Sequence, residues 1–223
     1  MLLFVMVLEI RRNVVIKAIL FDLDGTLINT NTLILESFKY VLNNSLGVKA
    51  GDDELIRYFG EPLSYTMSKY CEEKTEELVN AYIEYCATIH DDYTEGYDGV
   101  EEALIELKNR GYKLAVVTSK RRNTALRGLR LFDLEKYFDV IITPEDTTKH
   151  KPNPEPVLKA LELLDVKSEE AIMIGDSHND ILSGKAANAK TCLVKYTFIP
   201  LEEVLKHEPD YAIDDMRELL NIL

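Results

Sequence analysis

Residues 14–21 form a nearly continuous apolar run, VVIKAILF, in which half of the side chains are β-branched. Such a run is typical of a strand that is buried on both faces, as strands in parallel sheets are. The run leads directly into Asp22-Leu23-Asp24-Gly25-Thr26. Because open α/β sheets bind ligands at the carboxyl ends of their strands, these two carboxylates stand where a site is expected.

After Gly96 the chain alternates between short apolar runs and amphipathic segments. This alternation predicts βαβ units, and therefore a parallel sheet with helices on both sides. We expect an α/β fold whose core is a Rossmann-like doubly wound parallel sheet. The expected strands are 113–117, 140–142, 171–174, 191–194 and 211–213, and the expected helices are 100–110, 123–131, 154–164, 181–187 and 214–222.

Residues 30–92 interrupt the alternation with helical patterns and no convincing strand. Apolar residues recur there at helical spacing, and the longest helix is expected over 73–90. Gly60-Glu61-Pro62 breaks the pattern, as glycine and proline do. The sequence therefore predicts a small α-helical cap domain, residues 30–93, inserted into a core domain made of residues 13–29 and 94–223.

The charge balance limits the partners that the chain can bind. The net charge is −13 and the pI is about 4.8. An acidic surface repels nucleic acid and anionic membranes, so we expect neither as a partner. The same surface repels a phosphorylated substrate, so a phosphate site in this chain needs a local positive source, such as a metal ion or a cluster of lysines and arginines.

Two further features bear on the cellular compartment. The three cysteines, Cys71, Cys86 and Cys192, are scattered and show no metal-ligand spacing, which indicates reduced thiols in a cytoplasmic protein. The apolar segment 1–8 is far shorter than the roughly 18 residues of a membrane span and lacks the pattern of a secretory signal. We expect no stable membrane insertion, and residues 1–12 remain either an extra strand or a start-site extension.

Carboxylates recur after the expected strands. Asp22 and Asp24 follow the first strand, and Asp176 and Asp180 follow the strand over 171–174. Like charges gathered at one edge of a sheet resist joint ionisation unless a cation neutralises them. Oxygen ligands favour Mg²⁺, which would also supply the positive charge that the chain lacks. A carboxylate can in addition act as a covalent nucleophile toward phosphorus.

Candidate hydrogen-bond donors to a phosphoryl group also follow expected strands. Thr118 and Ser119 follow the strand over 113–117, and Lys151 lies in the loop before the helix over 154–164. Hydroxyl groups and an ammonium can hold phosphoryl oxygens and balance charge in a transition state. Each feature alone has an ordinary structural explanation, such as a turn, a helix cap or a solvated lysine. Their shared position at strand ends makes a common site the better interpretation.

The motifs resemble those of the haloacid dehalogenase superfamily. Asp22-Leu23-Asp24-Gly25-Thr26 matches its first motif, Thr118 the second, Lys151 the third, and Gly175-Asp176-Ser177-His178-Asn179-Asp180 the fourth. The resemblance covers nearly all of the chain from Val14 onward. It implies that residues 30–92 are the family's small cap, which closes over the site and excludes water.

The resemblance also implies roles. Asp22 would be the nucleophile that forms an aspartyl-phosphate, and Asp24 would be the general acid and then the base that activates water. Mg²⁺ would be bound by the carboxylates of Asp22 and Asp176 and by the backbone carbonyl of Asp24. Asp180 would orient the metal ligands or Lys151 from outside the coordination sphere.

A closer resemblance, to pyrophosphatases and phosphoglycolate phosphatases of the superfamily, rests on residues 21–31, 118–124, 151–158 and 206–210. It implies a small phosphorylated substrate, with inorganic pyrophosphate as the first candidate and phosphoglycolate or another small phosphomonoester as the second. A link to the phosphocarrier protein HPr follows only from this resemblance. A catalytically silent, magnesium-dependent binding domain is the alternative from a different class.

Three residues are weaker candidates for substrate binding. Lys120 and Arg122 belong to the densest basic run, directly after the second motif, and one or both can reach the distal phosphate of a compact substrate. A solvated helix start explains the run equally well. Gly60 lies in a Gly-Glu-Pro segment that resembles the substrate loop of related phosphatases, although a simple helix stop is the competing explanation.

Overall fold

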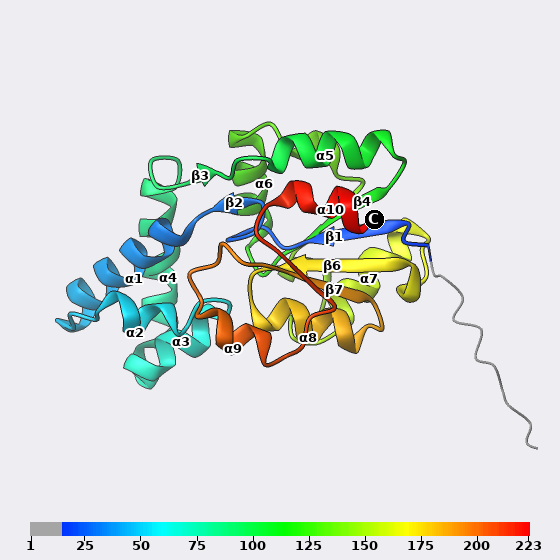
Figure 1. Cartoon of the computed structure of the whole chain (residues 1–223). Helices are drawn as coiled ribbons and strands as arrows, with labels where there is room; N and C mark the ends of the chain where they lie inside the picture. The colour runs from blue at the N-terminus through cyan, green and yellow to red at the C-terminus, as the bar shows by residue number, and fades with distance from the viewer. Residues whose placement is uncertain (1–14) are drawn as a thin grey trace, which may run out of the picture.

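A computed structural model describes residues 15–223, and its core is a six-stranded sheet in which every pair of neighbours is parallel (Figure 1). The order of the strands is β5-β4-β1-β6-β7-β8. The expected α/β fold is confirmed. The expectations for residues 1–12 lie outside the described residues. The first strand begins at Ala18 and not near Val14 as expected, because residues 15–17 form no strand. The strands are β1 (Ala18–Phe21), β4 (Lys113–Val117), β5 (Val140–Ile142), β6 (Ala171–Gly175), β7 (Lys190–Val194) and β8 (Tyr211–Ile213).

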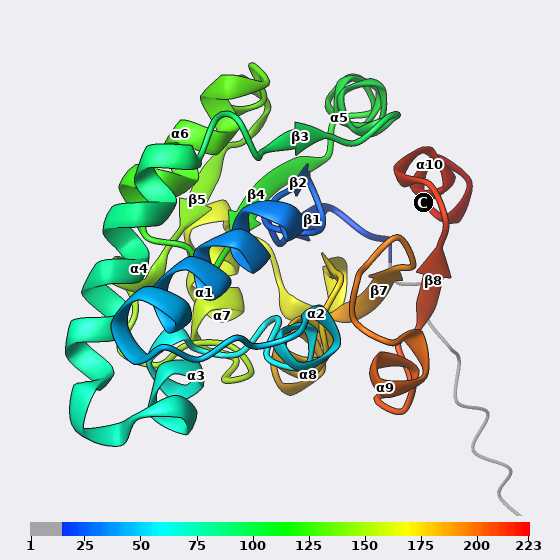
Figure 2. The same ribbon diagram turned by 90° about the vertical axis from the view of Figure 1, so that its left-hand side faces the viewer.

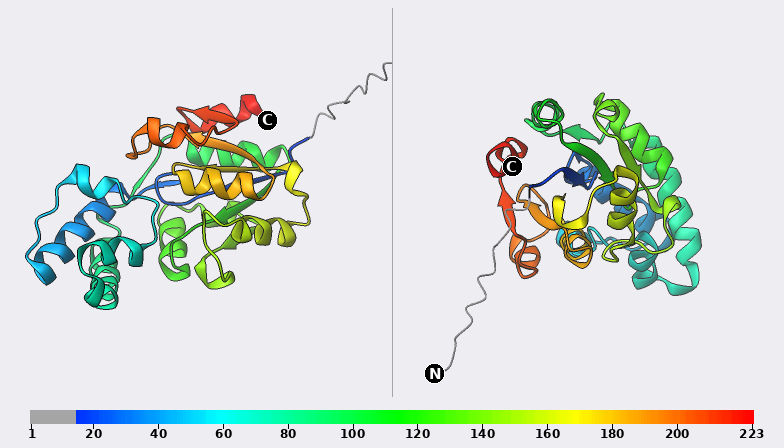
Figure 3. Two further views of the ribbon diagram at one scale, coloured as in Figure 1. Left: turned by 90° about the horizontal axis from the view of Figure 1, so that it is seen from below. Right: turned by 90° about the vertical axis from the view of Figure 1, so that its right-hand side faces the viewer.

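Alternate side chains of the central strands pack into two separate cores. Ile19 and Phe21 face one core and Ala18 and Leu20 the other, because successive residues of a strand point to opposite faces. All four side chains of β1 are fully buried, which explains why residues 18–21 are apolar, whereas Val15 before the strand is 70% exposed. Figure 3 shows helices on both sides of the sheet, as expected for a doubly wound core.

The helices that cover the sheet divide between its faces. The first face is covered by α5 (Val100–Asn109), α6 (Arg122–Leu131) and the terminal α10 (Leu219–Ile222), and the second by α7 (Glu155–Leu164) and α8 (His178–Ala186). The short helix α9 (Leu201–Leu205) was not expected from the sequence. The expected closing helix over 214–222 is instead a 3₁₀ turn, Met216–Glu218, followed by α10.

Four helices form the inserted segment: α1 (Asn31–Leu46), α2 (Asp52–Ile56), α3 (Leu63–Tyr70) and α4 (Thr75–Ile89). Helices α1 and α4 pack against each other and stand beyond one end of the sheet, at the left of Figure 1. Figure 2 views the molecule from that side, with α1 in front. The segment enters and leaves through a two-stranded antiparallel ribbon, β2 (Ile28–Asn29) with β3 (Glu95–Gly96). We propose the division into core and cap at residues 29/30 and 93/94 because this ribbon joins the two connecting segments.

The cap contacts the core through a third apolar cluster. Leu35, Leu42 and Phe59 of the cap pack in one cluster with Ile181 and Ile199 of the core. None of the helices in the described part of the chain is long and apolar enough to cross a membrane. The three cysteines are free thiols, as the sequence predicted.

The core position of β1 yields a stability prediction. Leu20→Ala, which removes a fully buried side chain, should lower the free energy of unfolding by about 3 kcal/mol, because it leaves a cavity between β1 and its neighbours. Leu158→Ala is the matched control, since Leu158 on α7 is 44% exposed, and it should cost less than about 1 kcal/mol. Urea unfolding followed by circular dichroism measures both, and equal losses would contradict the assignment of β1 to the core.

Candidate active site

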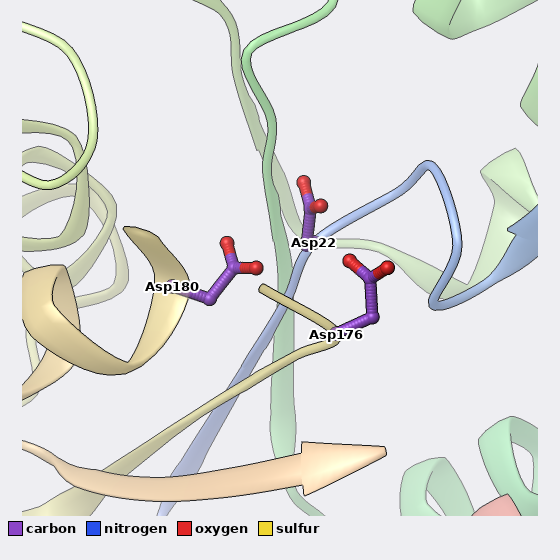
Figure 4. A group of neighbouring side chains, drawn as sticks. All are labelled: Asp22, Asp176 and Asp180. Carbon is purple, nitrogen blue, oxygen red and sulfur yellow. The ribbon is translucent and has the colours of Figure 1, made fainter. Parts of the chain in front are cut away.

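Three carboxylates meet at the carboxyl end of the sheet. Asp22 follows β1, Asp176 follows β6 and Asp180 lies in the first turn of α8, and one oxygen of each lies within 4.8 Å of the others (Figure 4). All three residues are buried. Adjacent parallel strands place their ends side by side, so β1 and β6, which are neighbours in the sheet, bring two distant sequence motifs together.

The ammonium of Lys151 lies inside this group. It donates hydrogen bonds to Asp22 Oδ1 at 2.8 Å, to Asp180 Oδ1 at 2.6 Å and to the carbonyl oxygen of Val117 at 2.9 Å. All three of its donors are therefore used. Burial alone would lower the pKa of Lys151, but the carboxylates of Asp180 and Asp22 raise it above its ordinary value, so the lysine remains charged.

One lysine does not neutralise three buried carboxylates. Burial raises the pKa of Asp22 from 3.8 to about 7; Lys151 opposes this shift, and Asp180 adds to it. Burial also raises the pKa of Asp176 well above its usual range, with further contributions from Asp180 and Asp22. Both shifts report the cost of holding negative charge away from water, and a bound cation would remove that cost.

Both carboxylate oxygens of Asp180 accept hydrogen bonds from neighbouring residues. Its Oδ1 accepts from Lys151, and its Oδ2 accepts from the backbone N–H and the hydroxyl of Ser177, at 3.1 Å and 2.6 Å. This capping box opens α8. A side chain at Gly175 would meet Asp180, because an added Cβ would lie 2.3 Å from its Cβ, so the glycine lets the helix pack closely against β6.

Asp22 and Asp176 keep oxygens that could bind a metal ion. Among the described residues, Asp22 Oδ2 and Asp176 Oδ1 accept no hydrogen bond, while Asp176 Oδ2 accepts from the hydroxyl of Thr197 at 2.9 Å. Two carboxylates with spare oxygens and raised pKa values fit a hard cation such as Mg²⁺. Gly25 packs against Asp176 at a positive φ of 76°, and an added Cβ would lie 2.4 Å from Asp176 Oδ2.

Asp24 lies outside this group and has partners of its own. Its Oδ1 accepts from the hydroxyl of Thr30 at 2.7 Å and from the ammonium of Lys120 at 2.7 Å. The backbone N–H of Lys120 donates to Thr118 Oγ1 at 3.0 Å, which joins the first and second motifs. Thr118 is buried and Ser119 is exposed. The two aspartates of the first motif therefore have different cations as neighbours.

The two basic candidates for substrate binding, Lys120 and Arg122, pair with different acids. The side chain of Lys120 points to Asp24, whereas the guanidinium of Arg122 pairs with Asp146, and its backbone N–H lies 3.3 Å from the carboxylate oxygens of Glu145. In the described part of the chain, no contact joins Arg122 to the three clustered carboxylates. The structure thus brings Lys120 into the site and holds Arg122 beside it.

Gly60 lies at the junction of cap and core. Its carbonyl accepts from Asn179 Nδ2 at 2.8 Å, and Glu61 Oε1 lies 3.2 Å from His178 Nε2. An added Cβ at Gly60, whose φ is 82°, would lie 2.9 Å from Ser177 Cβ. The cap loop therefore rests on the first turn of α8, directly beside the clustered carboxylates.

Three further residues, Thr30, Thr197 and Asn179, bond to the site or its border, although none was a candidate from the sequence. Asn179 carried a signal, because it lies inside the fourth motif between Asp176 and Asp180. Thr30 also carried one, since it lies in the segment 21–31 that resembles related phosphatases, whereas Thr197 lies in a segment without a recognisable pattern and only the fold places it beside Asp176.

The raised pKa of Asp22 predicts how pH and metal act on stability. An acid whose pKa rises from 3.8 to about 7 on folding favours the folded state at low pH, and this contribution is lost as pH rises from about 4 to 7. Without metal, Asp22→Asn should therefore raise the melting temperature relative to wild type more at pH 7.5 than at pH 4. Thermal melts in EDTA across this range test the trend, and a constant difference would contradict it.

Mg²⁺ should reverse the order at neutral pH. Binding to the folded state alone stabilises a protein, and the wild type offers the cation one more charge than Asp22→Asn does. The same melts repeated with saturating Mg²⁺ should show a larger upward shift for the wild type than for the variant. Equal shifts would mean that Asp22 does not bind the metal.

Comparison with known proteins agrees with this geometry. The family model for haloacid dehalogenase-like hydrolases matches residues 19–194. A Caldanaerobacter subterraneus protein that carries the provisional name pyrophosphatase PpaX is 52% identical over 208 residues, which span 93% of this chain and 94% of that protein. Pyrophosphatase PpaX of Bacillus cereus is 44% identical over 208 residues, which span 93% and 96% of the two chains.

Solved structures give the same result. A haloacid dehalogenase-like hydrolase of Streptococcus pneumoniae superposes with a TM-score of 0.83 at 26% identity, covering 93% of this chain and 98% of that one. A predicted phosphoglycolate phosphatase of Haemophilus somnus also superposes with a TM-score of 0.83 at 26% identity, covering 93% and 97%. The chain belongs to the haloacid dehalogenase-like hydrolases, and within them it is a phosphohydrolase.

Proposed function

We propose that the protein hydrolyses inorganic pyrophosphate in a magnesium-dependent reaction that passes through an aspartyl-phosphate on Asp22. The observation that carries the proposal is that the two aspartates of the first motif have different hydrogen-bond partners. Asp22 is held by Lys151 among the buried carboxylates, whereas Asp24 is held apart by Thr30 and Lys120. These different partners support a role in nucleophilic attack for Asp22 and a role in proton transfer for Asp24.

The first half of the reaction forms the covalent intermediate. A carboxylate oxygen of Asp22 attacks phosphorus, a new O–P bond forms, and the bond from that phosphorus to the bridging oxygen breaks. Asp24 in its acid form gives its proton to the departing phosphate. Lys151, fixed by its three hydrogen bonds, balances the charge that develops beside Asp22. The hydroxyl of Thr118, which accepts from the backbone N–H of Lys120, would donate to a phosphoryl oxygen.

The second half restores the enzyme. Asp24, now a carboxylate, takes a proton from a water molecule as the water attacks phosphorus, and the O–P bond to Asp22 breaks. Asp22 returns as a carboxylate and Asp24 as an acid, so one water and one pyrophosphate give two phosphates. The cap loop around Gly60, which rests on α8, keeps other water away from the intermediate.

The metal site completes the proposal. Asp22, Asp176 and the backbone carbonyl of Asp24 would hold Mg²⁺, with Asp180 orienting Lys151 and Ser177 from outside. When bound, the ion would neutralise the clustered carboxylates and the negative phosphoryl oxygens. The chemistry of the donors supports this assignment, since they are oxygen atoms alone.

The names of the relatives favour pyrophosphate as the substrate, and the protein named phosphoglycolate phosphatase keeps a small phosphomonoester as the second candidate. We also infer a cytoplasmic location, which fits the free thiols, and leave a link to HPr as an inference from the resemblance. A catalytically silent domain would leave the paired aspartates of the first motif without a purpose.

The deciding measurement is phosphate release from pyrophosphate, phosphoglycolate and an aryl phosphate, each with Mg²⁺ and with EDTA. We expect a magnesium-dependent preference for pyrophosphate. A preference for phosphoglycolate would keep the mechanism and move the substrate, whereas no release from any of the three would favour a binding domain.

Asp22→Asn should abolish turnover by a factor of at least about a thousand, because an amide oxygen cannot form the intermediate. Folding should be retained, as judged by circular dichroism, because the amide still accepts the hydrogen bond from Lys151. Residual activity close to that of the wild type would rule out a covalent role for Asp22.

Asp176→Ala should raise the Mg²⁺ concentration needed for half-maximal activity by roughly tenfold to a hundredfold, since it removes a proposed ligand. Lys185→Met, an exposed site on the last turn of α8, serves as the control and should leave the titration unchanged. An unaltered magnesium titration for Asp176→Ala would place the metal elsewhere.

A further inference from the structure

Lys120 has an unusual position for a lysine that follows a strand. It lies between β4 and α6, its side chain is only 11% exposed, and its ammonium lies 2.7 Å from Asp24 Oδ1. Its backbone N–H is fixed on Thr118 Oγ1. The residue is therefore anchored in the second motif and extends across the site to the second carboxylate of the first motif.

The ammonium keeps unused capacity. A lysine has three donors, and in the part of the chain that the structure describes Asp24 Oδ1 is the single hydrogen-bond acceptor of Lys120 Nζ. The cap helix α4 is close enough to feel this charge. Burial raises the pKa of Cys86 on α4 and Lys120 opposes the rise, while burial lowers the pKa of His90, which follows α4, and Lys120 adds to that fall. The ammonium of Lys120 thus lies near both the first motif and the cap.

The other cations close to the site are occupied or distant. Lys151 uses all three donors, and Arg122 is paired with Asp146. Arg121 is exposed at the start of α6, and no hydrogen bond or ion pair within residues 15–223 joins its side chain to the site. Among the described residues, Lys120 is consequently the cation that combines contact with a site carboxylate and spare donors.

The contact with Lys120 also restrains Asp24. Oδ1 of Asp24 accepts from both Lys120 and Thr30, so that oxygen is not free to meet a leaving group. A substrate with a second anionic group would offer Lys120 a more highly charged partner, and Asp24 would keep Thr30. The lysine stem is long and flexible enough for such an exchange.

We propose that Lys120 is a specificity-determining residue that moves from Asp24 to a second anionic group of the substrate. The selected class is then phosphate compounds that carry another anionic group next to the scissile phosphate. The proposal rests on the proposed function, since it needs Asp24 to serve the leaving group. An ester with a neutral leaving group offers Lys120 no new partner, so Lys120 stays paired with Asp24. Such a substrate gains no contact with Lys120, and Asp24 Oδ1 stays occupied.

The test compares kcat and KM for pyrophosphate and for phenyl phosphate, whose tail is neutral, in wild type, Lys120→Met and Lys120→Arg. Lys120→Met should lower kcat/KM for pyrophosphate by roughly tenfold to a hundredfold more than for phenyl phosphate, because a charged hydrogen bond is lost. Lys120→Arg, which keeps the charge, should restore most of the preference. Lys185→Met, the exposed charge control, should match the wild type.

Equal losses for both substrates, or no loss for either, would overturn the proposal, since Lys120 would then be only a support for Asp24 or have no part in selection. Lys120→Gln replaces the methionine variant if circular dichroism shows that the latter does not fold.

A binding measurement separates this proposal from the proposed function. Imidodiphosphate resists hydrolysis and keeps two anionic groups, so calorimetry with Mg²⁺ reports its binding without turnover. Binding should weaken at least about tenfold in Lys120→Met, whereas binding of inorganic phosphate should change far less. If the wild type hydrolyses no substrate but this difference appears, the proposed function fails and the role of Lys120 in selecting doubly anionic ligands stands. Unchanged binding of imidodiphosphate would refute that role.

Discussion

The buried ammonium of Lys151 is the contact on which the site depends. It joins Asp22 after β1, Asp180 on α8 and the last residue of β4, Val117, through three hydrogen bonds. Without it, two carboxylates that are almost inaccessible to water would face each other with no countercharge. The bond to Asp22 therefore orients that carboxylate and at the same time makes its burial tolerable. Asp176 has no such cationic partner among the described residues, and it is the carboxylate whose charge a bound metal ion would neutralise.

Much of this arrangement could be predicted from the sequence because it follows from the parallel sheet. The continuous apolar run before Asp22 indicated a strand covered on both faces, and the cores on its two sides show why every residue of β1 is apolar. Once the strands are parallel, the residues after them must gather at one edge. The clustering of Asp22 and Asp176 is thus a consequence of the parallel topology, and it could be predicted without knowledge of individual long-range contacts.

The partners of individual side chains could not be predicted, because a sequence pattern does not determine them. Lys120 and Arg122 are both basic and two residues apart, yet one pairs with Asp24 and the other with Asp146. Which acid each residue meets is set by the turn between β4 and α6 and by the 3₁₀ segment that carries Asp146. The ribbon of β2 and β3 could not be predicted for a related reason, because each strand has only two residues and is too short to show a periodic pattern.

The cap and the carboxylate cluster share one short piece of chain, the first turn of α8. Ser177 bonds Asp180 on its inner side, and its Cβ fills the space beside Gly60 of the cap on its outer side. Asn179 on the same turn donates to the carbonyl of Gly60. A shift of α8 that alters Asp180 would therefore also move the seat of the cap loop. Because Asp180 holds Lys151, and Lys151 holds Asp22, the position of the cap and the position of the Asp22 carboxylate, the proposed nucleophile, are mechanically linked through contacts that are all shorter than 3 Å.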